Sequence, residues 1–185
     1  AIYASGSNQG NNNWEKTVWT QSIQSYETLF QQDLDGDGTT GLNLSNLTTA
    51  SGDTGGWLLK KDSNNSLYIS DSNGENIKAV KDDYGGTPNF DYSSSWGSGS
   101  SSSEAVAAEI NADNTFSIAI KHTHSFGSET NTDWEILTVS NSGVIDWNKS
   151  VWTQSIQPYE KAFGQDLDGD GSQGLNLGQL SSVDT

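Results

Sequence analysis

The chain has 185 residues, a formal net charge of −16, eight cationic side chains and no Cys. The charge disfavours nucleic acid as a partner, because this protein's field would repel a polyanion. The lack of Cys excludes disulfides, thiolate metal sites and cysteine nucleophiles, and no apolar run approaches membrane-spanning length, so we expect no membrane insertion.

The first predicted element is an amphipathic helix. Trp19, Ile23, Tyr26 and Phe30 recur at i, i+4, i+7 and i+11, which places them on one face of a helix. The helix leads directly into the acidic stretch "QDLDGDG", and an apolar segment follows. We therefore predict a unit of helix, acidic loop and apolar segment.

The acidic loop has the spacing of a calcium site. Asp33, Asp35 and Asp37 occupy loop positions one, three and five, Gly38 permits a sharp turn at position six, and the carbonyl of Thr39 would be the next ligand. Without a cation, carboxylates about 4 Å apart repel by about 1 kcal/mol even in water. We favour Ca²⁺ over Mg²⁺, which demands stricter octahedral geometry, and over a solvated acidic turn, which needs only one Asp and one Gly.

One ligand of the EF-hand pattern is missing from this loop. Its position twelve, where an EF-hand carries a bidentate Glu, is Leu44. Glu27, just over one helical turn before the loop, is the candidate for the missing carboxylate.

The middle of the chain has the short apolar runs and turn signals of strands. The predicted strands lie at 56–62, 66–71, 75–81, 104–110, 115–122, 133–140 and 144–147. Residues 82–103 are rich in Gly and Ser and are predicted to be a loop or insertion. This pattern predicts a mainly β fold with flanking short helices, in which an antiparallel β-sandwich or meander is bracketed by two helix–calcium-loop motifs.

Two aromatic residues of the Ser-rich stretch are candidates for ligand binding. Tyr92 and Trp96 could form an exposed platform on which sugar rings stack, and burial in the sandwich core is the interpretation we favour. His122 and His124 could share one face of a strand and bind a transition metal, but no third ligand is apparent. No nucleophile elbow or placed carboxylate pair indicates catalysis, so we expect no enzyme activity.

The last predicted segment repeats the first. Residues 147–180 align with 14–47 without a gap and match at 24 of 34 positions, with a separation of 133 residues from Asp33 to Asp166. The predicted second helix carries Trp152, Ile156, Tyr159 and Phe163. The second set of calcium ligands is Asp166, Asp168, Asp170 and the carbonyl of Ser172, with Glu160 as the extra candidate. We therefore predict two Ca²⁺ sites, one in each loop.

The repeat suggests how the chain is organised. We expect residues 1–50 to be the end of a preceding repeat, 51–146 to be a β-rich domain, and 147–185 to be a second helix and calcium-loop motif. The parent protein would then be a tandem array, of which this chain holds one full unit and the opening of the next.

Several of these segments resemble a known family. The stretch from "TDWEILTVS" to "SQGLNL", together with "WLLKKD", "LYISD" and "AVAAEI", resembles the tryptophan-rich repeat domain of Synechocystis and other cyanobacteria. The acidic loops also resemble those of EF-hand and dockerin modules. The family resemblance implies an extracellular, calcium-dependent, non-catalytic repeat near the end of a large exported protein.

We therefore expect a calcium-binding structural repeat of a secreted or cell-surface, adhesin-like protein. Its partners would be neighbouring repeats of the same chain. The alternative is a calcium-dependent carbohydrate-binding module, which would bind surface glycans through its loop aromatics.

Overall fold

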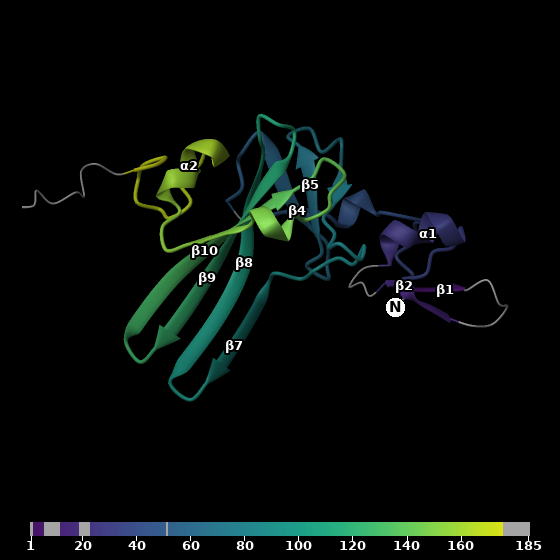
Figure 1. Ribbon diagram of the computed structural model, residues 1–185, viewed down its shortest axis with the longest axis horizontal. Helices are drawn as coiled ribbons and strands as arrows, with labels where there is room; N and C mark the ends of the chain where they lie inside the picture. Colours follow the sequence, from purple (N-terminus) through teal and green to yellow (C-terminus); the bar gives the residue numbers. More distant parts are fainter. Residues whose placement is uncertain (1, 6–11, 19–22, 51, 176–185) are drawn as a thin grey trace, which may run out of the picture.

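The structure is a computed structural model that describes residues 2–5, 12–18, 23–50 and 52–175. Figure 1 shows a β-rich body with one short helix on either side of it. The fold of the described residues is mainly β, with antiparallel sheets accompanied by two short α-helices, so the predicted fold class is confirmed. None of the helices in the described ranges is long and apolar enough to cross a membrane.

The largest sheet has five antiparallel strands in the order β11-β10-β9-β8-β7. Its members are β7 (Tyr92–Trp96), β8 (Gly99–Ile110), β9 (Phe116–Phe126), β10 (Glu129–Val139) and β11 (Val151–Thr153). A four-stranded sheet contains β3 (Thr48–Thr49), β4 (Trp57–Lys61), β5 (Leu67–Asp71) and β6 (Lys78–Ala79). A separate pair joins β1 (Ile2–Ser5) to β2 (Asn12–Val18).

The core lies between the two larger sheets. Leu59 and Ile69 from the smaller sheet share one buried cluster with Ile118 and Leu137 from the larger sheet. The opposite face of β8 to β10 is also buried, and Ala119 belongs to a second cluster there. The central strands therefore bury both faces, which explains their continuous apolar runs.

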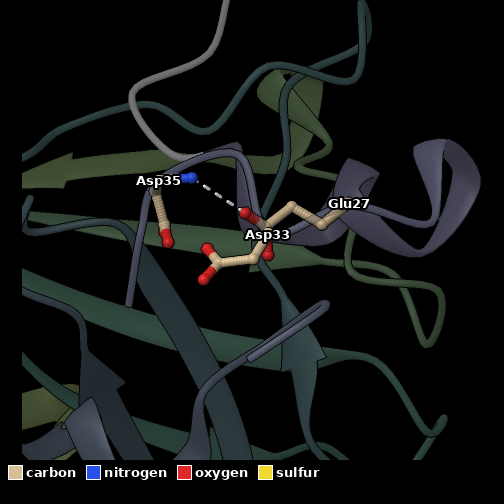
Figure 2. Close-up of side chains that lie close together, drawn as sticks. All are labelled: Glu27, Asp33 and Asp35. Atoms are coloured by element: carbon tan, nitrogen blue, oxygen red, sulfur yellow. Dashed lines mark hydrogen bonds between the residues drawn. The ribbon is translucent and has the colours of Figure 1, made fainter. Parts of the chain in front are cut away.

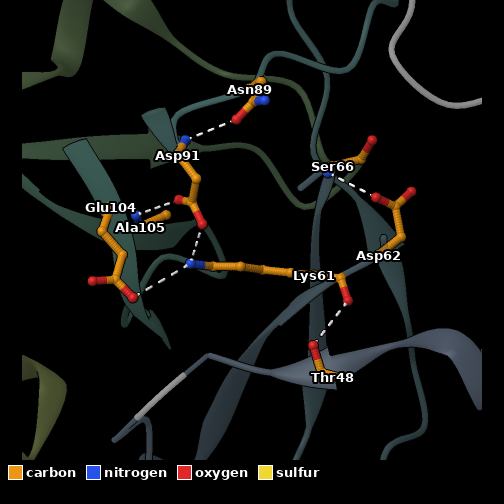
Figure 3. Close-up of polar contacts among 8 residues, drawn as sticks. All are labelled: Thr48, Lys61, Asp62, Ser66, Asn89, Asp91, Glu104 and Ala105. Atoms are coloured by element: carbon orange, nitrogen blue, oxygen red, sulfur yellow. Dashed lines mark hydrogen bonds and ion pairs between the residues drawn. The ribbon is translucent and has the colours of Figure 1, made fainter. Parts of the chain in front are cut away.

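A buried cation joins the two sheets at one edge. The Lys61 ammonium on β4 lies 2.5 Å from a carboxylate oxygen of Asp91, and the other oxygen of Asp91 accepts a bond from the backbone of Ala105 on β8 (Figure 3). Glu104 lies 3.9 Å from the same ammonium. Because the Lys61 and Asp91 side chains are largely buried, each charge compensates the desolvation of the other.

Of the predicted loop or insertion at 82–103, residues 82–91 lie outside the named strands, but residues 92–103 form a hairpin. β7 and β8 pair from Tyr92 opposite Ser103 to Trp96 opposite Gly99, and a two-residue turn joins them. The side chain of Trp96 lies over Gly99, with the indole nitrogen 2.8 Å from where a Cβ would be. Backbone bonds to neighbouring strands hold these Ser residues extended, although their composition indicates a loop.

The helices are shorter than the apolar spacing predicts. α1 spans Gln24–Phe30 and α2 spans Gln157–Phe163. Trp152 lies outside the helix, in β11, where it pairs with Glu135 of β10. The predicted helix start at Trp152 is therefore wrong, because pairing with a long neighbouring strand outweighs the local helical period; Trp19 lies outside the described residues.

Candidate metal centres

Both acidic loops begin at a left-handed helix cap. The residue after α1, Gln31, has φ 54°, and the residue after α2, Gly164, has φ 66°. The backbone N–H of Gln32 donates to the carbonyl of Glu27, and that of Gln165 donates to the carbonyl of Glu160; each distance is 3.3 Å. The same local geometry therefore turns each chain segment from helix into loop.

A fully buried glutamate anchors the first loop from the preceding helix. Glu27 has no solvent exposure. One carboxylate oxygen accepts backbone bonds from Leu34 (2.6 Å) and Asp35 (3.1 Å), and the other accepts from Gly41 (2.9 Å). The carboxylate thus connects the start of the loop to its end.

The second loop repeats this arrangement contact for contact. Glu160 is also fully buried. Its carboxylate accepts from Leu167 (2.7 Å) and Asp168 (3.1 Å) through one oxygen and from Gly174 (2.9 Å) through the other. Sequence analysis identified Glu27 and Glu160 as candidate ligands but missed this backbone-binding role; their ligand role stays a prediction.

The first Asp of each loop organises the turn that follows. Asp33 accepts backbone bonds from Gly36 (2.7 Å) and Gly38 (2.9 Å). These glycines have φ of 80° and 89°, in the left-handed region that favours glycine. Asp166 accepts equivalent bonds from the second loop, so both loops close around their first carboxylate.

Three carboxylates converge in each loop. One oxygen from each of Glu27, Asp33 and Asp35 lies within 4.8 Å of the others, and the second copy brings Glu160, Asp166 and Asp168 together in the same way. Figure 2 shows the Asp33 and Asp35 carboxylates beside Glu27 at the end of α1. Exposed carboxylates above a buried anchor can hold a metal ion, and an all-oxygen donor set suits a hard cation.

The third Asp of each loop lies outside these groups. Asp37 accepts a side-chain bond from Gln24 in the first turn of α1 (3.1 Å) and a backbone bond from Thr39 (2.9 Å). The Thr39 hydroxyl donates to the same carboxylate and is the main cause that lowers the pKa of Asp37 below its usual value.

The second copy fastens its third Asp in the same manner. Asp170 accepts from Gln157 (2.7 Å) and from the Ser172 backbone (2.9 Å). The predicted ligand roles of these Asp residues and of the carbonyls of Thr39 and Ser172 stay predictions. The helix Gln was missed by sequence analysis, although both copies carry it.

The exposed end of the loop does not supply an EF-hand acid. Leu44, at position twelve, begins the 3-10 helix η1 (Leu44–Asn46) and is 57% exposed. Its counterpart Leu177 lies outside the described residues. Among the described residues, the carboxylate that joins the loop Asp pair therefore comes from the preceding helix.

Surroundings distinguish the two loops. Asp168 shares a shallow hollow with Trp134 and Lys121, and Lys121 also borders a hollow with Asp166. The Lys121 ammonium lies 5.5 Å from the centre of the Trp134 ring. The second loop therefore lies against the large sheet beside a cationic side chain.

Tyr92 and Trp96 are on the surface. They are 52% and 54% exposed, so the favoured expectation of core burial is wrong. The cause is that the smaller sheet covers only the inner part of the larger one, while the β7–β8 hairpin extends beyond it (Figure 1). Gly99 of β8 pairs with Trp96 on one side and with Phe126 of β9 on the other, and Phe126 is exposed too.

The two histidines share one strand face but have different surroundings. His122 is buried and its ring stacks on Trp152 with centroids 4.5 Å apart. Burial is the main cause that lowers its pKa below the usual value. His124 is exposed and its Nδ1 lies 3.0 Å from the Ser101 hydroxyl. Neither belongs to a metal-binding group among the described residues.

No known protein family, curated protein or solved structure matches this chain.

Proposed function

We propose that this chain is a non-catalytic, calcium-binding structural repeat module of a large secreted or cell-surface protein, with one Ca²⁺ in each acidic loop. A single observation supports it above all. Two loops 133 residues apart use the same buried Glu, the same backbone donors and the same exposed Asp pair. The setting on an exported, adhesin-like protein follows the resemblance to the tryptophan-rich repeats.

Calcium would rigidify the junction between each helix and the segment after it. The backbone bonds to Glu27 and Asp33 already shape the first loop, and they leave the two loop carboxylates close together and exposed. A divalent cation would remove the repulsion between these carboxylates. Ca²⁺ suits such a loop because it accepts six to eight oxygen ligands in flexible geometry, with water completing the set.

Calcium titration of the metal-free protein tests the proposal. We expect two equivalents in calorimetry and a higher melting temperature, because a ligand at 100 times its dissociation constant adds about 2.7 kcal/mol per site. Asp35→Ala and Asp168→Ala are each expected to remove one equivalent and leave the other. No binding at millimolar Ca²⁺ would contradict the calcium role.

The position of Trp134 helps to assign the two equivalents. Because Trp134 borders the same hollow as Asp168, terbium bound in the second loop should be sensitised by this indole. Trp134→Phe should therefore weaken that emission while the calorimetric stoichiometry stays at two.

The matched control for Asp35→Ala and Asp168→Ala is Asp83→Ala, which removes one negative charge at an exposed residue outside both loops.

A second candidate is calcium-dependent carbohydrate binding. The observation in its favour is that Trp96, Tyr92 and Phe126 are exposed on strands that also carry many serine hydroxyls, with His124 opposite Ser101. Flat aromatic rings beside hydroxyls suit sugar rings, and the strongly acidic chain favours neutral over anionic glycans.

Glycan binding is tested on an array in the presence of Ca²⁺. We expect Trp96→Ala to reduce binding to any neutral glycan captured by the wild type by about tenfold or more, the scale of losing a stacking contact of 1–3 kcal/mol. Trp147→Ala, at an exposed Trp that is not part of this hairpin, should leave capture unchanged. An array without bound glycans would contradict carbohydrate binding and leave only the structural calcium role.

A further inference from the structure

The helix α2 docks on the outer face of the large sheet. Ile156 and Phe163 are buried there in one cluster with Ala107, Ala119 and Trp134. Phe163 is only 1% exposed. The face of the sheet opposite the main core is therefore closed by the second repeat segment.

A buried glutamine fastens the second loop to the two larger sheets, which together form the β body. Gln165 accepts a bond from the Thr54 backbone (2.9 Å) through its side-chain oxygen and donates to the Asp53 carboxylate (3.0 Å). Asp53 also accepts from the backbones of Leu59 in β4 and Ala108 in β8. The amide of Gln165 thus joins the loop to both larger sheets.

The first repeat segment carries the same side chains without these contacts. Phe30, the counterpart of Phe163, is 46% exposed, and Leu34, the counterpart of Leu167, is 44% exposed. Gln32, the counterpart of Gln165, is also exposed. α1 touches its own β body elsewhere, where the Tyr26 hydroxyl donates to the carbonyl of Gly85 over 2.7 Å.

The segments match in part in the strands that precede each helix. β1 and β2 form an antiparallel pair before α1, as β10 and β11 do before α2. With the separation of 133 residues, β1 corresponds to residues inside β10 and Val18 to Val151 of β11, whereas the middle of β2 corresponds to the 3-10 helix η2 (Trp147–Lys149).

The differences between the helices avoid the docking face. From Ile156 to Gly171, the second copy differs from the first only at Pro158, Lys161, Ala162 and Gly164. All four are exposed in α2. Every side chain that α2 buries against the sheet is thus present in α1.

From these contacts we propose that the exposed face of α1 is a docking surface that can replace α2 on the outer sheet face of a second β body of this kind, supplied by another copy of this chain whose α2 is released. In its own chain α1 is held on the other side of the β body from α2, where Tyr26 bonds Gly85 (Figure 1). Phe30 would enter the position that Phe163 fills, and Gln32 would bond the Asp53 and Thr54 of the other β body. The choice of partner rests on the proposed repeat role.

Freeing the sheet face tests this docking in solution. Phe163→Asp places a charge in the buried cluster and should release α2, which exposes the face to α1 of another molecule. In saturating Ca²⁺, which reduces repulsion between acidic chains, we expect sedimentation to show a mass that rises with concentration above that of the monomer. Phe30→Asp/Phe163→Asp should stay monomeric at the same concentrations.

Two results of this experiment would overturn the proposal. One is a folded Phe163→Asp chain that stays monomeric at every concentration. The other is equal association of the single and double variants, which would mean that α1 is not the occupant. Circular dichroism of each variant establishes that it is folded.

A helix transplant decides the matter if Phe163→Asp does not fold. The variant carrying Pro158→Ser, Lys161→Thr and Ala162→Leu presents the α1 helix sequence to the sheet and keeps Gly164, whose φ of 66° favours glycine. We expect a melting temperature within about 2 °C of the wild type, the scale of exposed substitutions in a chain of this size. A melting temperature as low as that of Phe163→Ala would overturn the proposal.

Failure of docking is distinguishable from failure of the calcium proposal. The calcium titration reads the loop carboxylates, whereas the association and transplant experiments read the apolar face. Two bound equivalents with no association would leave the calcium proposal standing and remove this one.

Discussion

Phe163→Ala is expected to lower the free energy of unfolding by about 3–5 kcal/mol, whereas Phe30→Ala should change it by less than about 0.5 kcal/mol. Both residues occupy the same place in the repeat, but Phe163 is 1% exposed and Phe30 is 46% exposed. Truncating the buried ring removes apolar contacts with the sheet and leaves a cavity, while the exposed ring has few contacts to lose.

Denaturant unfolding in saturating Ca²⁺ measures this difference. The two variants are matched controls for each other, because the mutation and the local sequence are nearly identical. Equal losses would mean that α1 is as firmly packed as α2, contrary to the structure. A small loss for both would mean that α2 contributes little to the stability of the β body.

Glu160→Ala is expected to lower the free energy of unfolding by about 3 kcal/mol or more and to abolish the calcium equivalent of the second loop. Removing the buried carboxylate leaves the backbone N–H groups of Leu167, Asp168 and Gly174 without their acceptor. Each unsatisfied donor costs about 1–3 kcal/mol where water cannot replace the bond. The loop would also lose the bond that joins its start to its end.

Two variants define what this experiment reports. Glu160→Gln keeps one acceptor oxygen but places an amide N–H₂ against a backbone donor, so an intermediate loss is expected. Glu27→Ala should remove the equivalent of the first loop and leave the second intact. Unchanged calcium stoichiometry in Glu27→Ala and Glu160→Ala alike would show that the anchor is dispensable for binding.

The duplicated segment separates local from contextual effects within one molecule. The bonds to Glu27 and Glu160 agree to within 0.1 Å. In contrast, Gln32 is exposed, while its counterpart Gln165 is buried against Asp53. The acidic loops therefore form from their own sequence, and the packing of the helices depends on what lies beside them.

Features that depend on neighbours along the chain could be predicted from the sequence. The loop spacing, the hairpin of β4 and β5 and the apolar parts of β8, β9 and β10 follow from period and turn residues. The contacts that shape the first loop span no more than 14 residues, from Glu27 to Gly41. Such contacts close in any copy of the segment.

Features that depend on distant partners could not be predicted from local sequence and are set by the packing of the whole chain. Residues 92–103 became a hairpin because β9 offered its backbone, and Trp152 became a strand residue because β10 lay beside it. Gln165 is buried by Asp53, 112 residues away. A local period gives no information about which distant face is free, and for this reason two nearly identical helices have one buried and one exposed apolar face.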